Sequence, residues 1–210
     1  MFIRTESFRT YVRSYPIVTT IIVINLALYL IYEVGFVWFH ILGVAKFASL
    51  FIGNNVYIAQ GEWWRVVTPI FFHATFEHVF FNCVSIFLFA PPLEEMLGKW
   101  KFSIAYLGSG IISNVLTYFF GPINLQYVGA SGAIFGLFGV FLFIILLRRE
   151  LIDRQSKQLI TIILIINLIW TFIFFVKIDV LGHLFGLLAG FVLGPILLFR
   201  TRGDWYYRRR

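Results

Sequence analysis

Long apolar segments alternate with short polar links along this 210-residue chain. About 20 consecutive apolar residues cross the hydrocarbon core of a bilayer as one helix, so each long segment predicts a membrane span. The six predicted spans cover residues of about 17–34, 78–97, 102–120, 131–147, 159–176 and 180–199. The pattern therefore predicts an all-α, polytopic membrane protein, a bundle of six transmembrane helices forming a single domain over residues 1–210, with polar tails 1–15 and 200–210.

Two features interrupt this simple alternation. Residues 35–65 are rich in aromatic side chains, but their apolar pieces are too short to span. Because tryptophan and tyrosine favour the membrane interface, we expect a folded first loop that lies partly in the membrane. Within the second span, Pro91-Pro92 predicts a bend or an end of the helix.

The composition supports a membrane protein over a soluble one. Hydrophobic residues make up 60% of the chain and charged residues 13%, whereas soluble domains are about 45–50% apolar and 25% charged. A single cysteine, Cys83, excludes an intramolecular disulfide and a cysteine-rich metal site. The segment His73-x-x-x-Glu77-His78 matches neither H-E-x-x-H nor H-x-x-E-H, so we expect no metal and no other cofactor.

The net charge of +7 is explained by topology. Of the 17 Lys and Arg residues, all but Lys46, Arg65 and Lys177 fall on one side of the predicted membrane. Basic residues mark the cytoplasmic side, so both termini are predicted to be cytoplasmic. We therefore expect the lipid bilayer, and not nucleic acid, as the partner of this basic surface.

A serine flanked by glycines opens the fourth span, in Gly129-Ala-Ser131-Gly132. Glycine permits a sharp turn, and free N–H groups at a helix N-terminus favour developing negative charge, so Ser131 is placed as a nucleophile would be. The alternative is a small-residue packing face, as Gly132-x-x-x-Gly136 suggests.

The sixth span carries the histidine that could activate this serine. Glycines recur every fourth residue around His183, and they form a stripe made of Gly182, Gly186, Gly190 and Gly194. The fourth span offers a matching set of glycines, so the two helices are predicted to pack backbone to backbone. Such packing would bring Ser131 and His183 to a similar depth, where an imidazole could act as base for the hydroxyl.

Further polar groups lie at the start of the second span. His78 and Asn82 are four residues apart and share one face of a helix. Polar side chains in a span are costly unless they are satisfied, so these two are candidates for a functional site. The alternative is a polar contact between helices.

Together these motifs resemble the rhomboid intramembrane serine proteases. The resemblance rests on Trp64-Arg65, His73-x4-His78-x3-Asn82, Gly129-Ala-Ser131-Gly132 and Gly182-His183-x2-Gly186-x3-Gly190, in this order along the chain. It implies a six-helix bundle with a membrane-immersed first loop and a site that opens to the non-cytoplasmic side. The implied substrates are transmembrane segments of other proteins, and the implied location is a bacterial plasma membrane; the oligomeric state is left open.

The resemblance also assigns roles to single residues. It makes Ser131 the nucleophile and His183 the general base, with the Ser131 N–H, His78 and Asn82 as the oxyanion hole. The implied supporting residues are His73, Arg65, Gly129, Gly132, Phe135, Gly186 and, on the second helix, Glu94. Phe135 stands where well-known members have a tyrosine, and Asp179 is expected in a loop near Phe175–Leu181 that caps the site.

Two other functions are compatible with parts of the sequence. A rhomboid-like protein without catalysis would bind transmembrane clients, but such relatives would lack the serine or the histidine. A transporter or channel would be expected to have intramembrane charges or broken helices in paired positions. The spans carry almost no buried charge apart from Glu94 and Glu95, near the cytoplasmic end.

Overall fold

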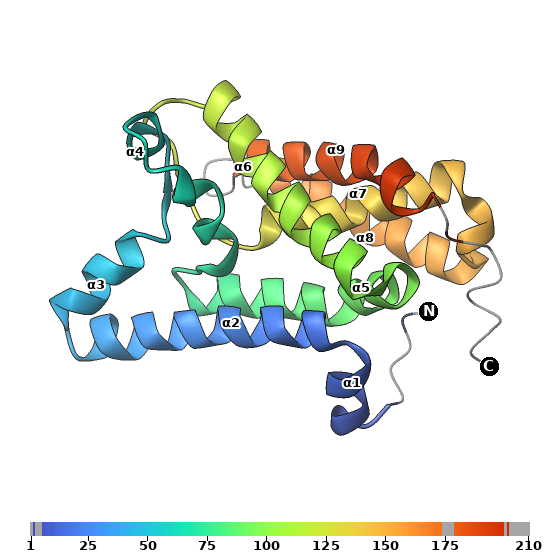
Figure 1. The fold of residues 1–210 in the computed structure, drawn as a ribbon, viewed down its shortest axis with the longest axis horizontal. Coiled ribbons are helices and arrows are strands. Elements are labelled where there is room, and N and C mark those ends of the chain that lie inside the picture. The colour runs from blue at the N-terminus through green and yellow to red at the C-terminus, as the bar shows by residue number, and fades with distance from the viewer. Residues whose placement is uncertain (1, 3–5, 174–178, 200, 202–210) are drawn as a thin grey trace.

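The fold is mostly helical, and the computed structural model describes residues 2, 6–173, 179–199 and 201. Figure 1 shows the order of the elements. The described elements are α1 (Phe8–Ser14), α2 (Pro16–Tyr32), the π-helix η1 (Glu33–Trp38), α3 (Leu42–Ser49), β1 (Gly53–Asn54), α4 (Asn55–Ala59), the 3-10 helices η2 (Trp63–Val66) and η3 (Thr68–Phe71), α5 (Phe76–Ser103), the π-helix η4 (Ile104–Gly108), α6 (Ser109–Phe120), β2 (Gln126–Tyr127), α7 (Ser131–Leu147), the 3-10 helix η5 (Arg149–Leu151), α8 (Arg154–Ile173) and α9 (Val180–Leu197).

Four helical segments in the described chain are long and apolar enough to cross a membrane. They are Pro16–Trp38, Phe76–Phe120, Arg154–Ile173 and Val180–Leu197, and α7 is a shorter apolar helix. The second segment has 45 residues, which as one straight helix would measure about 68 Å, more than twice the hydrocarbon thickness. It is broken at Gly98, beyond which α6 runs back across α5 (Figure 1).

This break falls in the link predicted between residues 97 and 102. The helix does not end at Pro91-Pro92, one of the two outcomes expected there; both prolines lie inside α5, and both are buried. The only residue of α5 with non-helical backbone is Gly98, with φ 75° and ψ 165°. Glycine takes a positive φ at no steric cost, so the chain turns there instead.

The helix bounds otherwise differ from the predicted spans mainly at their ends. α8 begins at Arg154, five residues before the predicted start at 159, and the predicted end at 176 lies outside the described residues. The predicted sixth span to 199 is helical to Leu197. α2 is followed directly by a π-helix that extends the helical segment to Trp38.

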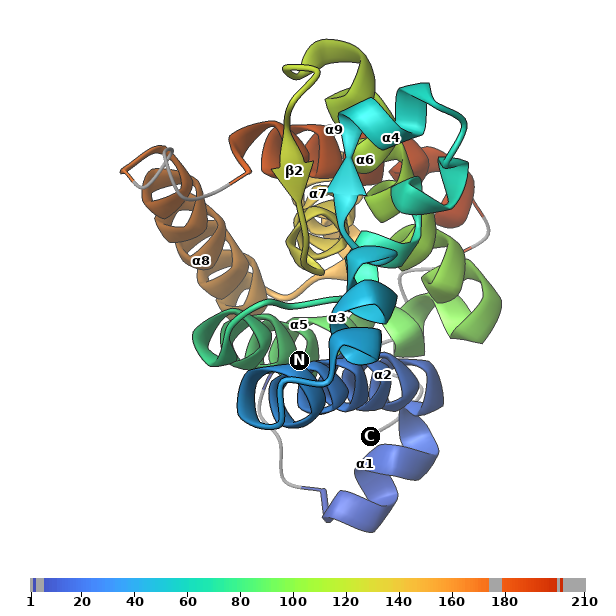
Figure 2. The ribbon, with the colours of Figure 1, turned by 90° about the vertical axis from the view of Figure 1, so that its left-hand side faces the viewer.

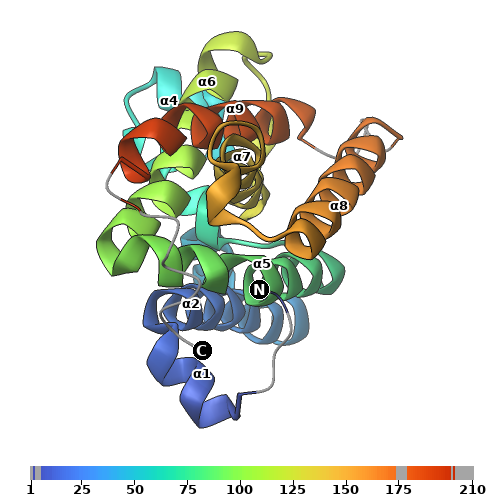
Figure 3. The ribbon, with the colours of Figure 1, turned by 90° about the vertical axis from the view of Figure 1, so that its right-hand side faces the viewer.

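The helix α7 forms the centre of the bundle. Residues 133–141 are all buried, as expected of a helix that is apolar on every side. α9 and α6 pack along it, and α5 and α8 lie beside it (Figures 2 and 3).

A buried carboxylate fixes the start of α2. Glu94 accepts hydrogen bonds from the N–H groups of Ile17 (3.0 Å) and Val18 (2.9 Å), which have no partner within the helix. Neighbouring Glu95 instead accepts a hydrogen bond from the hydroxyl of Tyr15 (3.4 Å). Glu94 is thus the structural carboxylate of this helix, and it ties α2 to α5.

Basic side chains gather where α9 ends. Lys101 Nζ donates to the carbonyl of Leu197 (2.8 Å), and Arg148 donates to Leu198 (3.1 Å) and Thr201 (2.7 Å). Cations are favourable beside the free carbonyls of a helix C-terminus. The N-terminal ends of α5, α7 and α9 lie at the opposite end of the molecule, at the left in Figure 1.

The first loop is a folded unit of short helices with one strand. Buried Arg65 donates to the carboxylate of Glu62 (2.6 Å) and to the carbonyls of Ser49 (2.6 Å) and Ile52 (2.7 Å). Its guanidinium also lies over the ring of Tyr57. The Arg65 guanidinium therefore joins three parts of the loop. The antiparallel pairing of β1 with β2 ties the loop to the link before α7 (Figure 2).

Candidate active site

The turn that leads into α7 is fixed by its neighbours. Gly129 has φ +113°, a conformation that L side chains rarely adopt. Its N–H donates to the carbonyl of Pro69 (2.9 Å), and the next N–H, from Ala130, donates to Nε2 of His73 (3.3 Å). Ser131 is then the first residue of α7, where backbone N–H groups have no partner within the helix.

His73 supports this turn from outside the membrane spans. Its side chain is fully buried between η3 and α5. Burial, and to a lesser extent the neighbouring His78, lower the pKa of His73 to about 3. The ring is therefore neutral near pH 7, as it must be for Nε2 to accept the Ala130 N–H.

His78 and Asn82 both come from the first turns of α5 and converge on Gly129. A Cβ at Gly129 would lie 2.5 Å from Cε1 and Nε2 of His78, and 3.6 Å from Nδ2 of Asn82. The missing side chain thus leaves room for the His78 ring. The structure brings these two donors to the residue that lies two positions before Ser131.

Gly186 and Gly190 of α9 pack on Gly132 and Gly136 of α7, backbone against backbone. A Cβ at Gly186 would overlap the carbonyl oxygen of Gly132, and a Cβ at Gly132 would lie 3.5 Å from the carbonyl oxygen of Gly182. Ser113 of α6 donates to that same Gly182 carbonyl (2.6 Å). The α7 backbone at Gly132, next to Ser131, therefore packs closely on the α9 backbone at Gly186, one turn after His183.

The His183 ring is buried and is held on two sides. The Phe135 ring, one turn after Ser131, stacks on it with centroids 4.2 Å apart and an interplanar angle of 15°. On its edge, Nδ1 is 2.8 Å from the hydroxyl of Thr171 on α8. Phe135 therefore stacks on the His183 ring, and it lacks the hydroxyl that a tyrosine at this position would carry.

Ser131 is half-buried at the start of α7. Within the described residues, no hydrogen bond joins its hydroxyl to His183. Catalytic hydrogen bonds are often long in the absence of substrate and shorten in the Michaelis complex. The arrangement holds a hydroxyl, an imidazole and several hydrogen-bond donors at one end of the bundle.

Asp179 lies just before α9, at the end of the segment expected to cap the site. It is the N-cap of α9, and its carboxylate accepts the N–H of Gly182 (2.8 Å). Aspartate is among the preferred N-cap residues, because its side chain satisfies a free N–H of the first turn. Most of the expected cap loop near Phe175–Leu181 lies outside the described residues.

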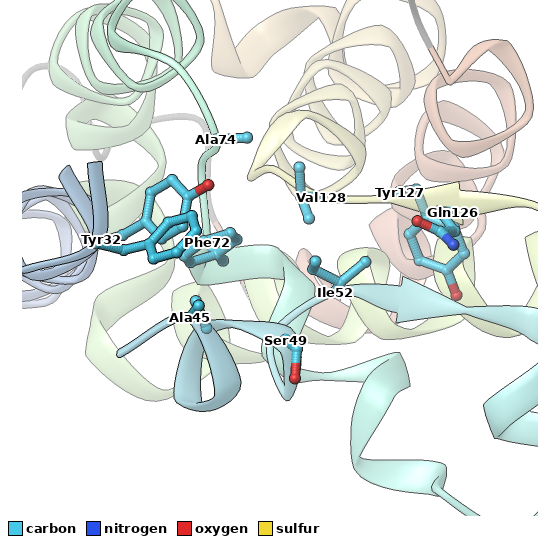
Figure 4. A pocket seen from close by; sticks show the side chains of 11 residues that line it. Tyr32, Ala45, Ser49, Ile52, Phe72, Ala74, Gln126, Tyr127 and Val128 are labelled. Carbon is cyan, nitrogen blue, oxygen red and sulfur yellow. The ribbon is translucent and has the colours of Figure 1, made fainter. Parts of the chain in front are cut away.

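A pocket of about 330 Å³ lies close to this site, between the first loop and the link before α7 (Figure 4). Its walls are mainly apolar and include Tyr32, Phe36, Ala48, Phe72, Tyr127 and Val128. Ser131 and His183 are not among the lining residues. The pocket and the Ser131–His183 pair are therefore separate features that share the link 126–131.

The helical membrane fold, with a serine and a histidine on two closely packed helices, is typical of one class of intramembrane enzyme. Comparison with known proteins identifies the family. A family model described as the Rhomboid domain matches residues 60–200. The chain belongs to the rhomboid family, and it is an integral membrane protein and a serine protease of that family.

Named relatives agree with this family. YdcA of Bacillus subtilis, whose name classes it as a rhomboid protease, is 48% identical over 193 residues, which are 92% of this chain and 94% of that protein. Rhomboid protease GluP of the same species is 39% identical over 144 residues, 69% of this chain and 28% of GluP. Rhomboid-like protease 1 of Toxoplasma gondii is 38% identical, over 66% of this chain and 48% of that protein.

Proposed function

We propose that this chain is an intramembrane endopeptidase that cleaves transmembrane segments of other proteins near the non-cytoplasmic face, with Ser131 as nucleophile and His183 as base. The observation that carries the proposal is the close packing of the Gly132 carbonyl, next to Ser131, on Gly186, one turn after His183, with Phe135 stacked on the His183 ring. A serine hydroxyl is a weak nucleophile until a base is held against it.

In the proposed reaction, Ser131 attacks a backbone carbonyl of the substrate while His183 takes the hydroxyl proton. The tetrahedral intermediate then collapses, His183 gives the proton to the leaving amine, and water hydrolyses the acyl-enzyme by the same steps. Negative charge on the intermediate would be met by the N–H of Ser131 and the side chains of His78 and Asn82. Their approach to Gly129 supports this role.

The position of the site favours substrates that unwind at one end. A transmembrane helix hides its carbonyl groups in hydrogen bonds, so cleavage requires small or helix-destabilising residues near the site. Lys101 and Arg148 lie at the end of the molecule opposite Ser131, which supports a site on the non-cytoplasmic side with cytoplasmic termini. The bacterial relatives support a bacterial plasma membrane as its location.

The test is labelling of the detergent-solubilised protein with a fluorophosphonate probe. We expect the wild type to be labelled, Ser131→Ala to be unlabelled, and His183→Ala to be labelled at a rate lower by several orders of magnitude. Asn82→Ala should be slowed by about 10²–10³-fold, the effect of one oxyanion donor. A folded wild type that stays unlabelled would contradict the proposal and favour a protein that binds transmembrane clients without cleaving them.

A further inference from the structure

Thr171 carries a buried hydroxyl near the C-terminal end of α8, a helix rich in Ile and Leu. Its Oγ1 lies 2.8 Å from Nδ1 of His183 and also 2.8 Å from the carbonyl oxygen of Asn167, one turn earlier in α8. Within the described residues, Thr171 is the side chain that is hydrogen-bonded to the His183 ring.

The number of protons in this cluster decides which way each hydrogen bond runs. A threonine hydroxyl has one proton, and the carbonyl of Asn167 can only accept. If Thr171 donates to Asn167, its oxygen lone pairs remain for the ring, and Nδ1 of His183 must carry the proton. A neutral imidazole with its proton on Nδ1 has a free lone pair on Nε2.

This tautomer is the one that a general base needs. With the proton on Nε2, the ring would accept from Thr171 through Nδ1, and the nitrogen left to face Ser131 could only donate. In serine proteases that have a third residue, a carboxylate behind the histidine fixes the same choice. No carboxylate is hydrogen-bonded to His183 in the part of the chain that the structure describes, and Asp179 is engaged at the N-terminus of α9.

We propose that Thr171 is a positioning residue that holds His183 in the Nδ1–H tautomer and so keeps Nε2 available to take the proton of Ser131. This inference rests on the proposed function and adds a third group, on a third helix, to the pair on α7 and α9. Thr171 touches neither the substrate nor the reacting atoms, and it acts through the ring.

The position of α8 gives this hydrogen bond a further role. α8 lies at the edge of the bundle (Figures 2 and 3), and Thr171 is the only buried residue in its last six, 168–173. The outer end of α8 is thus joined to α9 through the same bond that orients the base. Movement of this end away from α9 removes the acceptor of Nδ1–H.

The test compares two substitutions of Thr171 with one control. Thr171→Val keeps the shape and removes the acceptor, whereas Thr171→Ser keeps the hydroxyl. Thr161→Val is the matched control, because Thr161 makes the same hydrogen bond to a carbonyl one turn earlier in α8 (2.8 Å, to Lys157). For each full-length variant, the fluorophosphonate inactivation rate at saturation and the half-saturating probe concentration are measured separately.

We expect Thr171→Val to lower the saturating rate by about tenfold, the upper end of what one neutral hydrogen bond contributes. The half-saturating concentration should not change. Thr171→Ser and Thr161→Val should both react within about twofold of the wild-type rate, because each keeps a hydroxyl at position 171 that can accept from Nδ1–H of His183. A Thr171→Val variant that reacts at the wild-type rate would overturn the proposal.

A second readout does not depend on catalysis. With ¹⁵N-histidine, the chain has four labelled imidazole rings, and His183→Ala identifies the pair of ring-nitrogen signals that belongs to His183. We expect the Nδ1–H tautomer in wild type and in Thr171→Ser, and a mixture in Thr171→Val. An Nε2–H tautomer in wild type would refute the positioning role even if the protein is labelled, whereas an unlabelled wild type with the Nδ1–H tautomer would refute the proposed function alone.

Discussion

Gly129 meets two constraints that no other residue type satisfies together. Its φ of +113° is strained for any L side chain, and the His78 ring occupies the place of a Cβ. The substitution Gly129→Ala would therefore displace His78 from its position beside the Ser131 turn. We expect fluorophosphonate labelling to slow by roughly 10²-fold, the size of the loss of one oxyanion donor.

The control for this substitution is Gly61→Ala. Gly61 also has a positive φ, +102°, but a Cβ there would meet nothing within 4 Å. Gly61→Ala therefore introduces a similar backbone strain but no clash with a neighbouring side chain, and it should be labelled at close to the wild-type rate. Equal slowing in both variants would show that strain alone, and not the position of His78, accounts for the effect.

The residues of the candidate site differ in how far the sequence could foresee them. Ser131, His183, His78 and Asn82 stand out because polar groups are rare in apolar segments, and the glycine spacing predicted which helices meet. Thr171 was missed, since a threonine in a span commonly bonds to a carbonyl of its own helix, and nothing in the spacing says that it also meets His183.

At the scale of the helices, the packing of α7 on α9 depends on glycine. A Cβ at Gly190 would overlap the carbonyl oxygen of Gly136, and backbone cannot move aside as a flexible side chain can. Gly190→Ala should lower the free energy of unfolding by about 1–3 kcal/mol, the usual cost of overpacking. The measurement is the unfolding midpoint in mixed detergent micelles of increasing SDS fraction.

Gly108→Ala is the matched control within the bundle. A Cβ at Gly108 would have Leu193 Cδ1 as its nearest neighbour at 3.6 Å, an ordinary contact. This variant should unfold close to the wild-type midpoint. If Gly190→Ala is as stable as Gly108→Ala, close backbone packing does not hold α7 against α9.

The elements as such were largely predictable, and their ends were not. Apolar length indicated the spans, and membership of the rhomboid family is confirmed. Hydropathy placed a link between residues 97 and 102, where the break at Gly98 falls, but it does not show the positive backbone angle that makes the turn. It also gives no sign that a two-residue strand pair would join Gly53 to Tyr127, since such pairing depends on the tertiary fold.

At the scale of the whole molecule, the basic residues predict the orientation in the membrane. In a chain with Cys83→Ser, a new cysteine at exposed Asn124, in the link before α7, should react with a membrane-impermeant maleimide in intact bacterial spheroplasts. A cysteine at exposed Thr10, on α1, should react only after lysis. The Cys83→Ser chain without a new cysteine is the control, and the reverse pattern would contradict cytoplasmic termini.

The packing of α9 on α7 also has a consequence for biosynthesis. A polypeptide is made from its N-terminus, so α7 leaves the ribosome before α8 and α9 do. During that interval the proposed nucleophile has no base beside it, and Thr171 has no ring to orient. On the proposed mechanism, a nascent chain that has not yet inserted α9 holds an inert serine in the bilayer, and neighbouring nascent proteins are not exposed to a partly assembled protease.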